Sequence, residues 1–275
     1  MAGTLYVVAT PLGNLGDLSP RAADTLKTVA AVAAEDTRHT KTLITHVGSH
    51  AELISFHAHS SERALERILD LLGTGKDVAL VTDAGTPTVS DPGAVLVAAA
   101  RARDFPIATI PGPTAVAAAL AVSGLGADRY VFLGFLPRKG GDRRRLLEVV
   151  AESEWTVVLF EAPNRVADLL SDLAEVCGDD RDVAVSRELT KVFEETRAGT
   201  LAELAGYYAE APPRGEVTIV VSGTGKAAPE EVTIDPETRA RALLAQGMTR
   251  KDVADQVAEE TGISRNAAYR LVNDL

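Results

Sequence analysis

Short apolar runs alternate with amphipathic segments from the start of the chain. The runs are the candidate strands, at 4–10, 31–36, 53–59, 77–83 and 107–112. Segments that fit helices follow them at 20–29, 38–47, 61–73, 93–103 and 113–123, the first with Ser19 as N-cap and Pro20 at its first position. This alternation predicts an α/β fold, an open and largely parallel sheet with helices on both faces.

The pattern restarts after residues 124–126. Candidate strands lie at 130–136, 156–162, 182–189, 191–199 and 216–223, with helices at 141–153 and 164–177. The third and fourth of these strands are separated too briefly for a crossover helix, so this half should contain a hairpin and a mixed sheet. We therefore expect two α/β domains, at 1–120 and 121–226, with a ligand cleft between them.

A composition break at 223–231 predicts a linker, and a small helical unit should follow at 232–275. Thr249 is placed to cap a helix over 250–260, Gly262 allows a turn, and Ser264 is placed to cap a second helix over 265–272. This spacing is typical of a helix-turn-helix. The charges of this unit nearly cancel, which does not favour DNA binding. Two roles therefore stay open: the unit recognises a nucleic acid, or it is a docking or RNA-side accessory module.

The overall charge excludes some classes of protein. A net charge of −11 argues against a surface that attracts nucleic acid everywhere, although residues 138–145 carry five cations against one acid. A single Cys177 excludes an internal disulfide and fits a reducing cytoplasm. No apolar run approaches the roughly 18 residues of a membrane span, and the N-terminus lacks a signal sequence. We therefore expect a cytoplasmic protein.

Four loops rich in Gly, Pro, Asp and Thr follow predicted strands of the first half, at 10–17, 35–40, 82–93 and 111–115. In an open α/β sheet the ligand crevice lies outside the carboxyl ends of the strands. Glycine lets backbone approach a ligand closely, proline holds a turn rigid, and Asp and Thr supply hydrogen bonds. Four such loops on one edge predict a nucleotide-like ligand.

The better-known nucleotide motifs are absent. The two G-T-G-K segments, at 73–76 and 223–226, lack the frame of a phosphate-binding P-loop, and no G-x-G-x-x-G follows the first strand. His57 and His59 would share one face of a strand, but no cysteine lies near them. We expect hydrogen bonding or substrate contact from these histidines, and no metal site.

Charged residues follow two strand cores of the second half, in F-E-A-P-N-R at 160–165 and S-R-E-L-T-K-V-F-E-E at 186–195. Arg187, Glu188 and Lys191 fit an ion-pair network. On a cleft wall they would equally bind a ligand or move a proton, so both interpretations stay open.

Eight segments, taken in order, resemble a known family. They are T-P-L-G-N-L-G-D-L-S, A-E-D-T-R, S-F-H-A-H, D-A-G-T-P-T-V-S-D-P-G, P-G-P-T-A, F-L-G-F-L-P, F-E-A-P-N-R and R-E-L-T-K-V-F-E-E. The chain resembles the bacterial 16S ribosomal RNA cytidine-2′-O-methyltransferases, which belong to the tetrapyrrole methylase superfamily. The resemblance covers about residues 3–225, and the C-terminal unit is similar to the accessory helical domain of many members.

The resemblance implies S-adenosylmethionine bound between two tetrapyrrole-methylase-type domains, and a homodimer. It implies 2′-O-methylation of cytidine 1402 in the 16S rRNA of the small ribosomal subunit. The cofactor contacts that it carries over are Pro11, Asp83, Ala84, Gly85, Thr86, Val89, Thr114, Ala115 and Ala162, with Glu188 completing the site.

A ribose hydroxyl is a poor acid, so a nearby proton acceptor helps the transfer. The hypothesis names Glu188 first and Asp36 second, with Lys191 as an electrostatic helper. RNA affinity rests on cations that neutralise phosphates, and the candidates are Arg38, Arg138, Lys139, Arg143, Arg144, Arg145, Arg165 and Arg187.

Three alternatives remain open. Within the superfamily, the substrate would be a tetrapyrrole of the precorrin type, or a diphthine precursor on a protein. The basic cluster at 138–145 and the helix-turn-helix-like tail favour RNA. A non-enzyme alternative is a ligand-sensing regulator whose tail binds nucleic acid, and the acidic charge of the whole chain argues against it.

Overall fold

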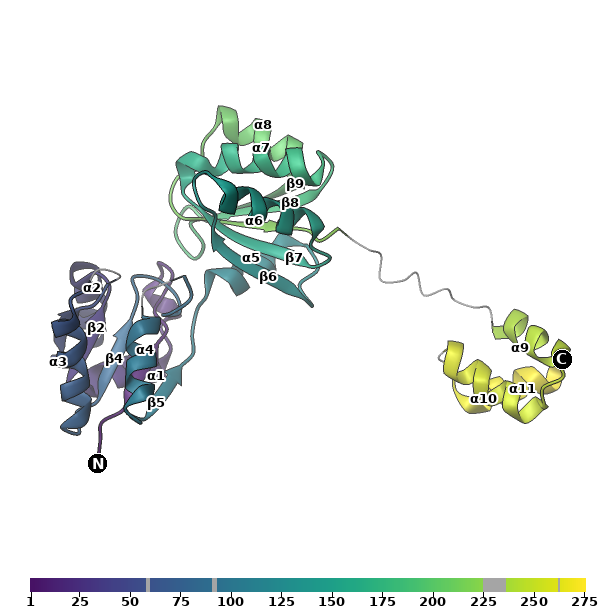
Figure 1. Cartoon of the computed structure of the whole chain (residues 1–275), viewed down its shortest axis with the longest axis horizontal. Helices are drawn as coiled ribbons and strands as arrows, with labels where there is room; N and C mark the ends of the chain where they lie inside the picture. Colours follow the sequence, from purple (N-terminus) through teal and green to yellow (C-terminus); the bar gives the residue numbers. More distant parts are fainter. Residues whose placement is uncertain (58–59, 91–92, 225–235, 262) are drawn as a thin grey trace. The chain divides into compact units, whose positions relative to one another are not determined.

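The computed structural model of the chain describes residues 1–57, 60–90, 93–224, 236–261 and 263–275. The chain divides into two compact units, Met1–Thr224 and Gly225–Leu275. The first unit contains two five-stranded sheets, each with its own helices (Figure 1).

The first sheet is entirely parallel, where the sequence predicts a largely parallel one. Its strands have the order β3-β2-β4-β1-β5, with bounds Leu5–Val8 (β1), Ala31–Ala34 (β2), Glu52–Ser55 (β3), Val78–Val81 (β4) and Ile107–Ile110 (β5). The helices between them are α1 (Pro20–Thr28), α2 (Thr37–Val47), α3 (Glu62–Gly73) and α4 (Ala94–Ala102). Each predicted strand and each of these helices is present, with the strands shortened at their ends.

Helices cover both faces of this sheet because its strands are apolar on both sides. Leu5 and Leu80 pack with residues of α3 and α4, whereas Val8 and Val32 pack with residues of α1 and α2. Full burial of a side chain of this size stabilises the fold by about 1.5–3 kcal/mol. At α1, the Ser19 hydroxyl accepts a hydrogen bond from the backbone N–H of Ala22, which confirms the predicted cap.

The second sheet is mixed, with the order β6-β7-β10-β8-β9. Its strands are Tyr130–Phe135 (β6), Thr156–Glu161 (β7), Asp182–Arg187 (β8), Glu195–Thr200 (β9) and Val217–Val221 (β10). β6 and β7 are parallel and the other neighbours are antiparallel, so the predicted hairpin of β8 and β9 is confirmed. β9 begins later than predicted, because the chain between it and β8 forms the turn.

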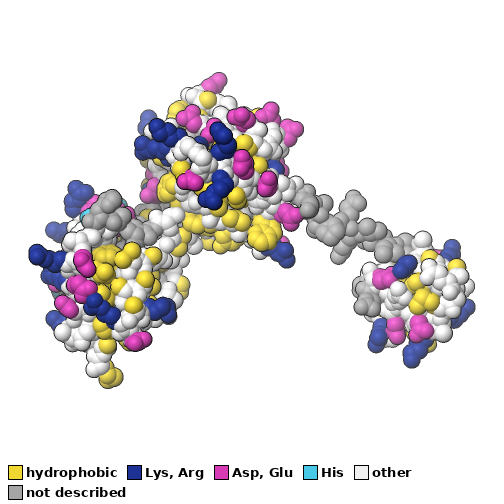
Figure 2. All heavy atoms as spheres, viewed as in Figure 1, with side chains coloured by type: hydrophobic (Ala, Val, Ile, Leu, Met, Phe, Trp, Pro, Cys, Tyr) yellow, Lys and Arg dark blue, Asp and Glu magenta, His cyan; other side chains and the backbone are white. Residues whose placement is uncertain are grey.

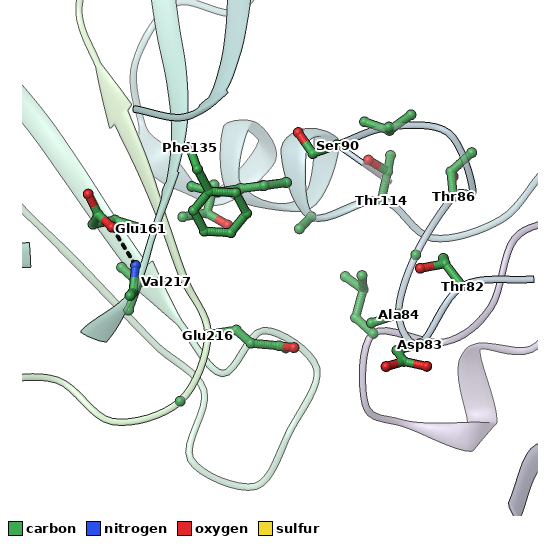
Figure 3. Close-up of a pocket in the computed structure, with 18 of the residues that line it drawn as sticks. Thr82, Asp83, Ala84, Thr86, Ser90, Thr114, Phe135, Glu161, Glu216 and Val217 are labelled. Carbon is green, nitrogen blue, oxygen red and sulfur yellow. Dashed lines mark hydrogen bonds between the residues drawn. The ribbon is translucent and has the colours of Figure 1, made fainter. Parts of the chain in front are cut away.

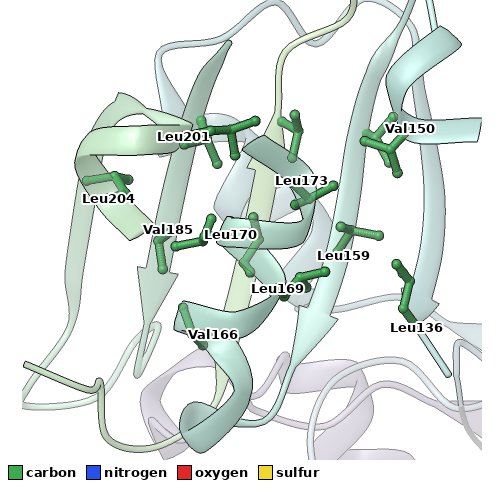
Figure 4. Packing of buried hydrophobic residues seen from close by; sticks show 14 of the residues in the cluster. Leu136, Val150, Leu159, Val166, Leu169, Leu170, Leu173, Val185, Leu201 and Leu204 are labelled. Atoms are coloured by element: carbon green, nitrogen blue, oxygen red, sulfur yellow. The ribbon is translucent and has the colours of Figure 1, made fainter. Parts of the chain in front are cut away.

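Helices α6 (Gly141–Glu152), α7 (Val166–Cys177) and α8 (Leu201–Glu210) pack with the second sheet in one core cluster. Leu169, Leu170 and Leu173 of α7 lie between that helix and the strands (Figure 4). Helix α8 was not predicted, although its N-terminus carries a capping box between Thr200 and Glu203.

Helix α5 (Ala115–Ser123) packs on the other face of the second sheet. Its Val116, Ala119 and Leu120 lie in one cluster with Val158 of β7 and Val220 of β10. The predicted boundary between residues 120 and 121 therefore falls inside a helix that packs with the second sheet. We refer to the first sheet with α1–α4 as the first lobe, and to α5 with the second sheet and its helices as the second lobe.

The C-terminal unit contains helices α9 (Pro236–Ala245), α10 (Arg250–Thr261) and α11 (Arg265–Asp274) around a small apolar core. Thr249 and Ser264 accept hydrogen bonds from the N–H groups of Asp252 and Ala267, so both predicted caps are confirmed. Helix α9 was not predicted. Most of the predicted linker, residues 225–231, and Gly262 lie outside the described residues. In the described ranges, every helix is too short or too polar to cross a bilayer.

Candidate functional site

A cavity of about 490 Å³ lies where the carboxyl-end loops of the first sheet meet the second lobe (Figure 3). One wall consists of loops of the first lobe and the N-terminus of α5. The other consists of the ends of β6 and β7 and the start of β10. The residues that line it are Leu12, Glu35, Thr82, Asp83, Ala84, Gly85, Thr86, Val89, Ser90, Thr114, Ala115, Phe135, Phe160, Glu161, Ala162, Pro163, Gly215, Glu216, Val217 and Thr218.

The loop after β4, here called the central loop (residues 82–90), is bonded to each of the other three loops. Thr10 and Gly85 exchange two backbone hydrogen bonds, of 2.8 and 3.2 Å. The Asp83 carboxylate accepts a hydrogen bond from the backbone N–H of Asp36 at 3.2 Å, and the Thr86 hydroxyl donates to the carbonyl of Pro113 at 3.2 Å. The four loops predicted from sequence thus form one connected wall.

The backbone of the central loop is unusual. Gly85 has a φ of +82°, and Thr88 and Ser90 have φ values of +74° and +59°. Residues other than glycine are strained in this region by about 1–3 kcal/mol each, and such strain clusters at ligand sites. The loop therefore holds a fixed shape beside the cavity.

The second wall is aromatic. Phe135 is 56% exposed and lines the cavity, with its ring 5.5 Å from that of Phe160. The β6–β7 register breaks between Phe132 and Gly134, and Gly134 has a φ of +65°. A Cβ on Gly134 would lie 2.7 Å from the Ser90 hydroxyl, so at this point the backbone of one wall lies directly against a side chain of the other.

An ion-pair network lies at one side of the cavity. The ammonium of Lys191, in the turn between β8 and β9, donates to the carboxylates of Glu188 and Glu216, both at 2.9 Å. The hydrogen bond from Lys191 holds the pKa of Glu188 below its usual range, against the opposite effect of desolvation. Burial disfavours the charged form of Lys191, but its two carboxylate partners outweigh that effect and raise its pKa. The aliphatic stem of Lys191 lies against Gly13 of the first lobe, where a Cβ would come within 2.5 Å.

Most of the cofactor contacts predicted from sequence line the cavity. These are Asp83, Ala84, Gly85, Thr86, Val89, Thr114, Ala115 and Ala162. Pro11 does not, and its neighbour Leu12 takes that place.

The three predicted catalytic residues do not line the cavity. Asp36 caps α2 through the backbone N–H of Arg38 and also binds the Arg38 guanidinium at 2.7 Å. Side-chain and backbone hydrogen bonds from Arg38 lower the pKa of Asp36 to about 2. In this structure Asp36 therefore caps α2 and is paired with Arg38. Glu188 and Lys191 lie beside the cavity, in the network described above.

Three of the predicted RNA-binding arginines line a second, polar cavity of about 350 Å³. Arg138, Arg143 and Arg165 surround it together with Asp168, Ser171 and Asp172. Arg143 is paired with Asp172 at 2.5 Å, and Arg165 with Glu161 at 3.1 Å. On the face shown in Figure 2, Lys and Arg side chains of the second lobe lie among Asp and Glu side chains.

The remaining predicted cations are dispersed. Lys139, Arg144 and Arg145 are exposed at and before the start of α6. Arg38 is exposed on α2, and Arg187 is paired with Glu195 at 2.8 Å. Within the described ranges, no three His, Cys, Asp or Glu side chains are grouped as a metal site would need. His57 is exposed beyond the end of β3, and His59 lies outside the described residues.

Sequence reasoning missed most of the second wall. Its residues Phe135, Phe160, Gly215 and Glu216 belong to segments far apart in the chain, which meet because β10 pairs antiparallel with β7. The segment P-R-G-E at 213–216 was the available signal, because a glycine before a strand often marks a close approach of backbone.

Comparisons with known proteins identify the class. Residues 4–205 match the family model of the Tetrapyrrole (Corrin/Porphyrin) Methylases. A cobalamin biosynthetic enzyme, cobalt precorrin-4 methyltransferase, has the same fold with a TM-score of 0.64 and 19% identity over 80% of this chain and 94% of its own. Uroporphyrin-III C-methyltransferase from Thermus thermophilus, solved with S-adenyl homocysteine, has a TM-score of 0.57 and 18% identity. The match covers 80% of this chain and 97% of that enzyme. The family match and the fold define a tetrapyrrole methylase.

Relatives of known name identify the group within the tetrapyrrole methylases to which the chain belongs. The ribosomal RNA small subunit methyltransferase I of Synechocystis sp. is 44% identical over 99% of this chain and 98% of its own length. The protein of the same name from Xylella fastidiosa (strain Temecula1) is 46% identical over 97% of this chain and 98% of its own length. The one from Pseudomonas aeruginosa is 42% identical over 98% of this chain and 96% of its own length. The chain belongs to the ribosomal RNA small subunit methyltransferase I family.

Proposed function

We propose that this chain transfers a methyl group from S-adenosylmethionine to a ribose 2′-hydroxyl of 16S ribosomal RNA. The observation that carries the proposal is the near full-length identity, at 42–46%, to the relatives described above, whose names state the substrate. The two-walled cavity supports it, because it supplies a backbone-lined cofactor site with an opening for a second substrate.

The residues of the cavity fit the cofactor. Ala84, Gly85 and Ala115 leave the wall without bulky side chains, so a nucleoside can approach the backbone closely. Thr86, Asp83 and Thr114 supply polar groups, and Phe135 and Phe160 supply an apolar surface opposite them. When bound, the cofactor supplies a methyl group on a positively charged sulfur, which leaves as a neutral thioether.

The protein contributes orientation. The ribose oxygen must lie about 3 Å from the methyl carbon and in line with the carbon–sulfur bond, and fixing that geometry is worth several kcal/mol. The central loop, which is hydrogen-bonded to the three neighbouring loops, and the Phe135 wall lie on either side of the cavity, which suits them to that task.

We further propose the finer assignments that the sequence suggests. The acceptor is cytidine 1402 of 16S rRNA in the small ribosomal subunit, and the enzyme is a cytoplasmic homodimer. The cavity lined by Arg138, Arg143 and Arg165 binds RNA phosphates next to the acceptor, since arginine matches phosphate geometry well.

Incubation of the purified chain with labelled S-adenosylmethionine tests the proposal, with small ribosomal subunits, naked 16S rRNA or uroporphyrinogen as acceptors. We expect label in 16S rRNA, at one ribose, located by mass spectrometry of nuclease fragments. Label on the tetrapyrrole and none on RNA would assign the chain to the other branch of the superfamily. Sedimentation equilibrium tests the dimer independently.

A further inference from the structure

Four carboxylate side chains belong to residues that line the large cavity, and three of them hold parts of its walls. The Glu161 side chain is fully buried and bound by the backbone N–H of Ala162 at 2.7 Å and by Arg165. Asp83 accepts the backbone hydrogen bond from Asp36, and Glu35 accepts one from the hydroxyl of Thr82 at 3.1 Å. These three groups are engaged in keeping neighbouring segments together.

Glu216 is different. Its side chain is 71% exposed, and it extends from the second wall toward Ala84 and Asp83 of the central loop (Figure 3). Its Oε2 accepts the hydrogen bond from Lys191, and Oε1 has no hydrogen-bond donor among the described residues. One oxygen is therefore held in place and the other is open to a ligand.

Glu188 fixes the backbone that carries Glu216. The N–H of Glu188 donates to the carbonyl of Glu216 at 3.0 Å, and the N–H of Glu216 donates to Oε1 of Glu188 at 3.3 Å. Gly215 has a φ of +81°, and any side chain there would collide with the Glu188 carboxylate. Glu188 also has a φ of +50°, a strained value that these contacts maintain.

We propose that Glu216 is the carboxylate that accepts the proton of the acceptor hydroxyl, and that Glu188 and Lys191 are positioning residues for it. The inference rests on the proposed function. The ribose oxygen forms a bond to the methyl carbon while the carbon–sulfur bond breaks, and the sulfur keeps that electron pair. The hydroxyl proton passes to Oε1 of Glu216 and later to water. Lys191 is ill suited to accept it, because its carboxylate partners favour the charged form.

The substitution Glu216→Gln tests this role with little change of shape, because the amide oxygen still accepts the hydrogen bond from Lys191. We expect the single-turnover rate of methyl transfer to 16S rRNA to fall by about 10²- to 10⁴-fold, the usual contribution of a positioned proton acceptor. The affinity for S-adenosylmethionine, measured by calorimetry, should change less than about threefold. In Glu216→Ala, added formate should restore part of the rate, because a small carboxylate can occupy the vacated space.

Two further variants separate positioning from proton transfer. Glu188→Gln should lower the rate less than Glu216→Gln, and formate should not restore it, because the carboxylate of Glu216 is still present. Glu66→Gln is the matched control, since Glu66 has an exposed ion pair with Arg103 outside the cavity. Its rate should equal that of the unchanged protein, and thermal melting of each variant establishes that it is folded.

Three outcomes overturn the inference. The first is a Glu216→Gln variant that keeps the full rate, and the second is one whose cofactor affinity falls in parallel with its rate. The third is a Glu188→Gln variant that loses more activity than Glu216→Gln and is rescued by formate. Failure of the unchanged protein to methylate 16S rRNA would instead refute the proposed function.

Discussion

Replacement of Gly85 by alanine tests whether the backbone of the central loop is a ligand surface. Gly85 has a φ of +82° and lines the cavity, whereas Gly124, with a φ of +74°, ends α5 outside it and has nothing within 4 Å of an added Cβ. An alanine in this left-handed region costs about 1–2 kcal/mol. Gly85→Ala and Gly124→Ala should therefore lose similar amounts of stability from backbone strain.

The variants should differ in cofactor binding. A Cβ on Gly85 would lie 3.2 Å from Cδ2 of Leu12, closer than the roughly 3.5–4.0 Å of an ordinary carbon contact. The loop or Leu12 must then move by several tenths of an ångström, and both line the cavity. We expect the dissociation constant for S-adenosylmethionine to rise about tenfold in Gly85→Ala, equivalent to about 1.4 kcal/mol, and to stay unchanged in Gly124→Ala.

Calorimetric titration with S-adenosylmethionine and thermal melting provide the two readouts. At about 2–4 °C per kcal/mol for a unit of this size, each variant should melt roughly 2–8 °C lower than the unchanged protein. Normal cofactor affinity in Gly85→Ala, with the expected fall in melting temperature, would refute the idea that this backbone contacts the ligand. An equal loss of affinity in both variants would attribute the effect to general instability.

Three other properties are open to direct measurement. Leu173 of α7 is fully buried against the second sheet, so Leu173→Ala should lower the free energy of unfolding by about 2–5 kcal/mol, read from urea denaturation; a loss below 1 kcal/mol would contradict this packing. Arg138→Ala should weaken RNA binding and reduce the slope of log affinity against log salt by about 0.7–0.9, whereas Lys27→Ala, on α1, should leave both unchanged. The hydrogen bond from Arg239 lowers the pKa of Glu260 to about 2, so its stabilisation is complete above pH 4.5 and is lost as the pH falls toward about 2. Glu260→Gln should remove that part of the acid sensitivity, which circular dichroism during acid titration detects; identical acid profiles would exclude it.

The strands and helices of the first lobe could be predicted from the sequence, because each strand is a short, continuous apolar run that is followed by a helix. Two helices escaped prediction for different reasons. The capping box of Thr200 and Glu203 marks the start of α8 in the sequence, but it directly follows the strong strand pattern of β9. Helix α9 follows residues that resemble a linker in composition. Both misses concern helices next to segments with a strong competing pattern.

The first wall was predictable from the sequence, whereas Ala162 was the one predicted cofactor contact on the second wall that lines the cavity. The central loop contains Gly85 and neighbouring prolines, and these residue types by themselves indicate a turn of special backbone conformation. The position of Glu216 depends on which strands pair, and an antiparallel β7–β10 pair brings the start of one strand beside the end of the other. The periodicity of the sequence indicates strands but not their neighbours. The residue types alone therefore favour Glu188, which stands in the more conspicuous motif.

The two lobes meet at pairs of residues that leave no room for an extra atom. Gly13 lies against the stem of Lys191, and Gly134 against the hydroxyl of Ser90. A side chain gained at either glycine requires a shorter or displaced partner on the opposite lobe, so the effects of substitutions at 13 and 191, or at 134 and 90, should not add. The two residues of each pair are therefore expected to change together in evolution. Such coupled changes would keep the distance between the lobes constant.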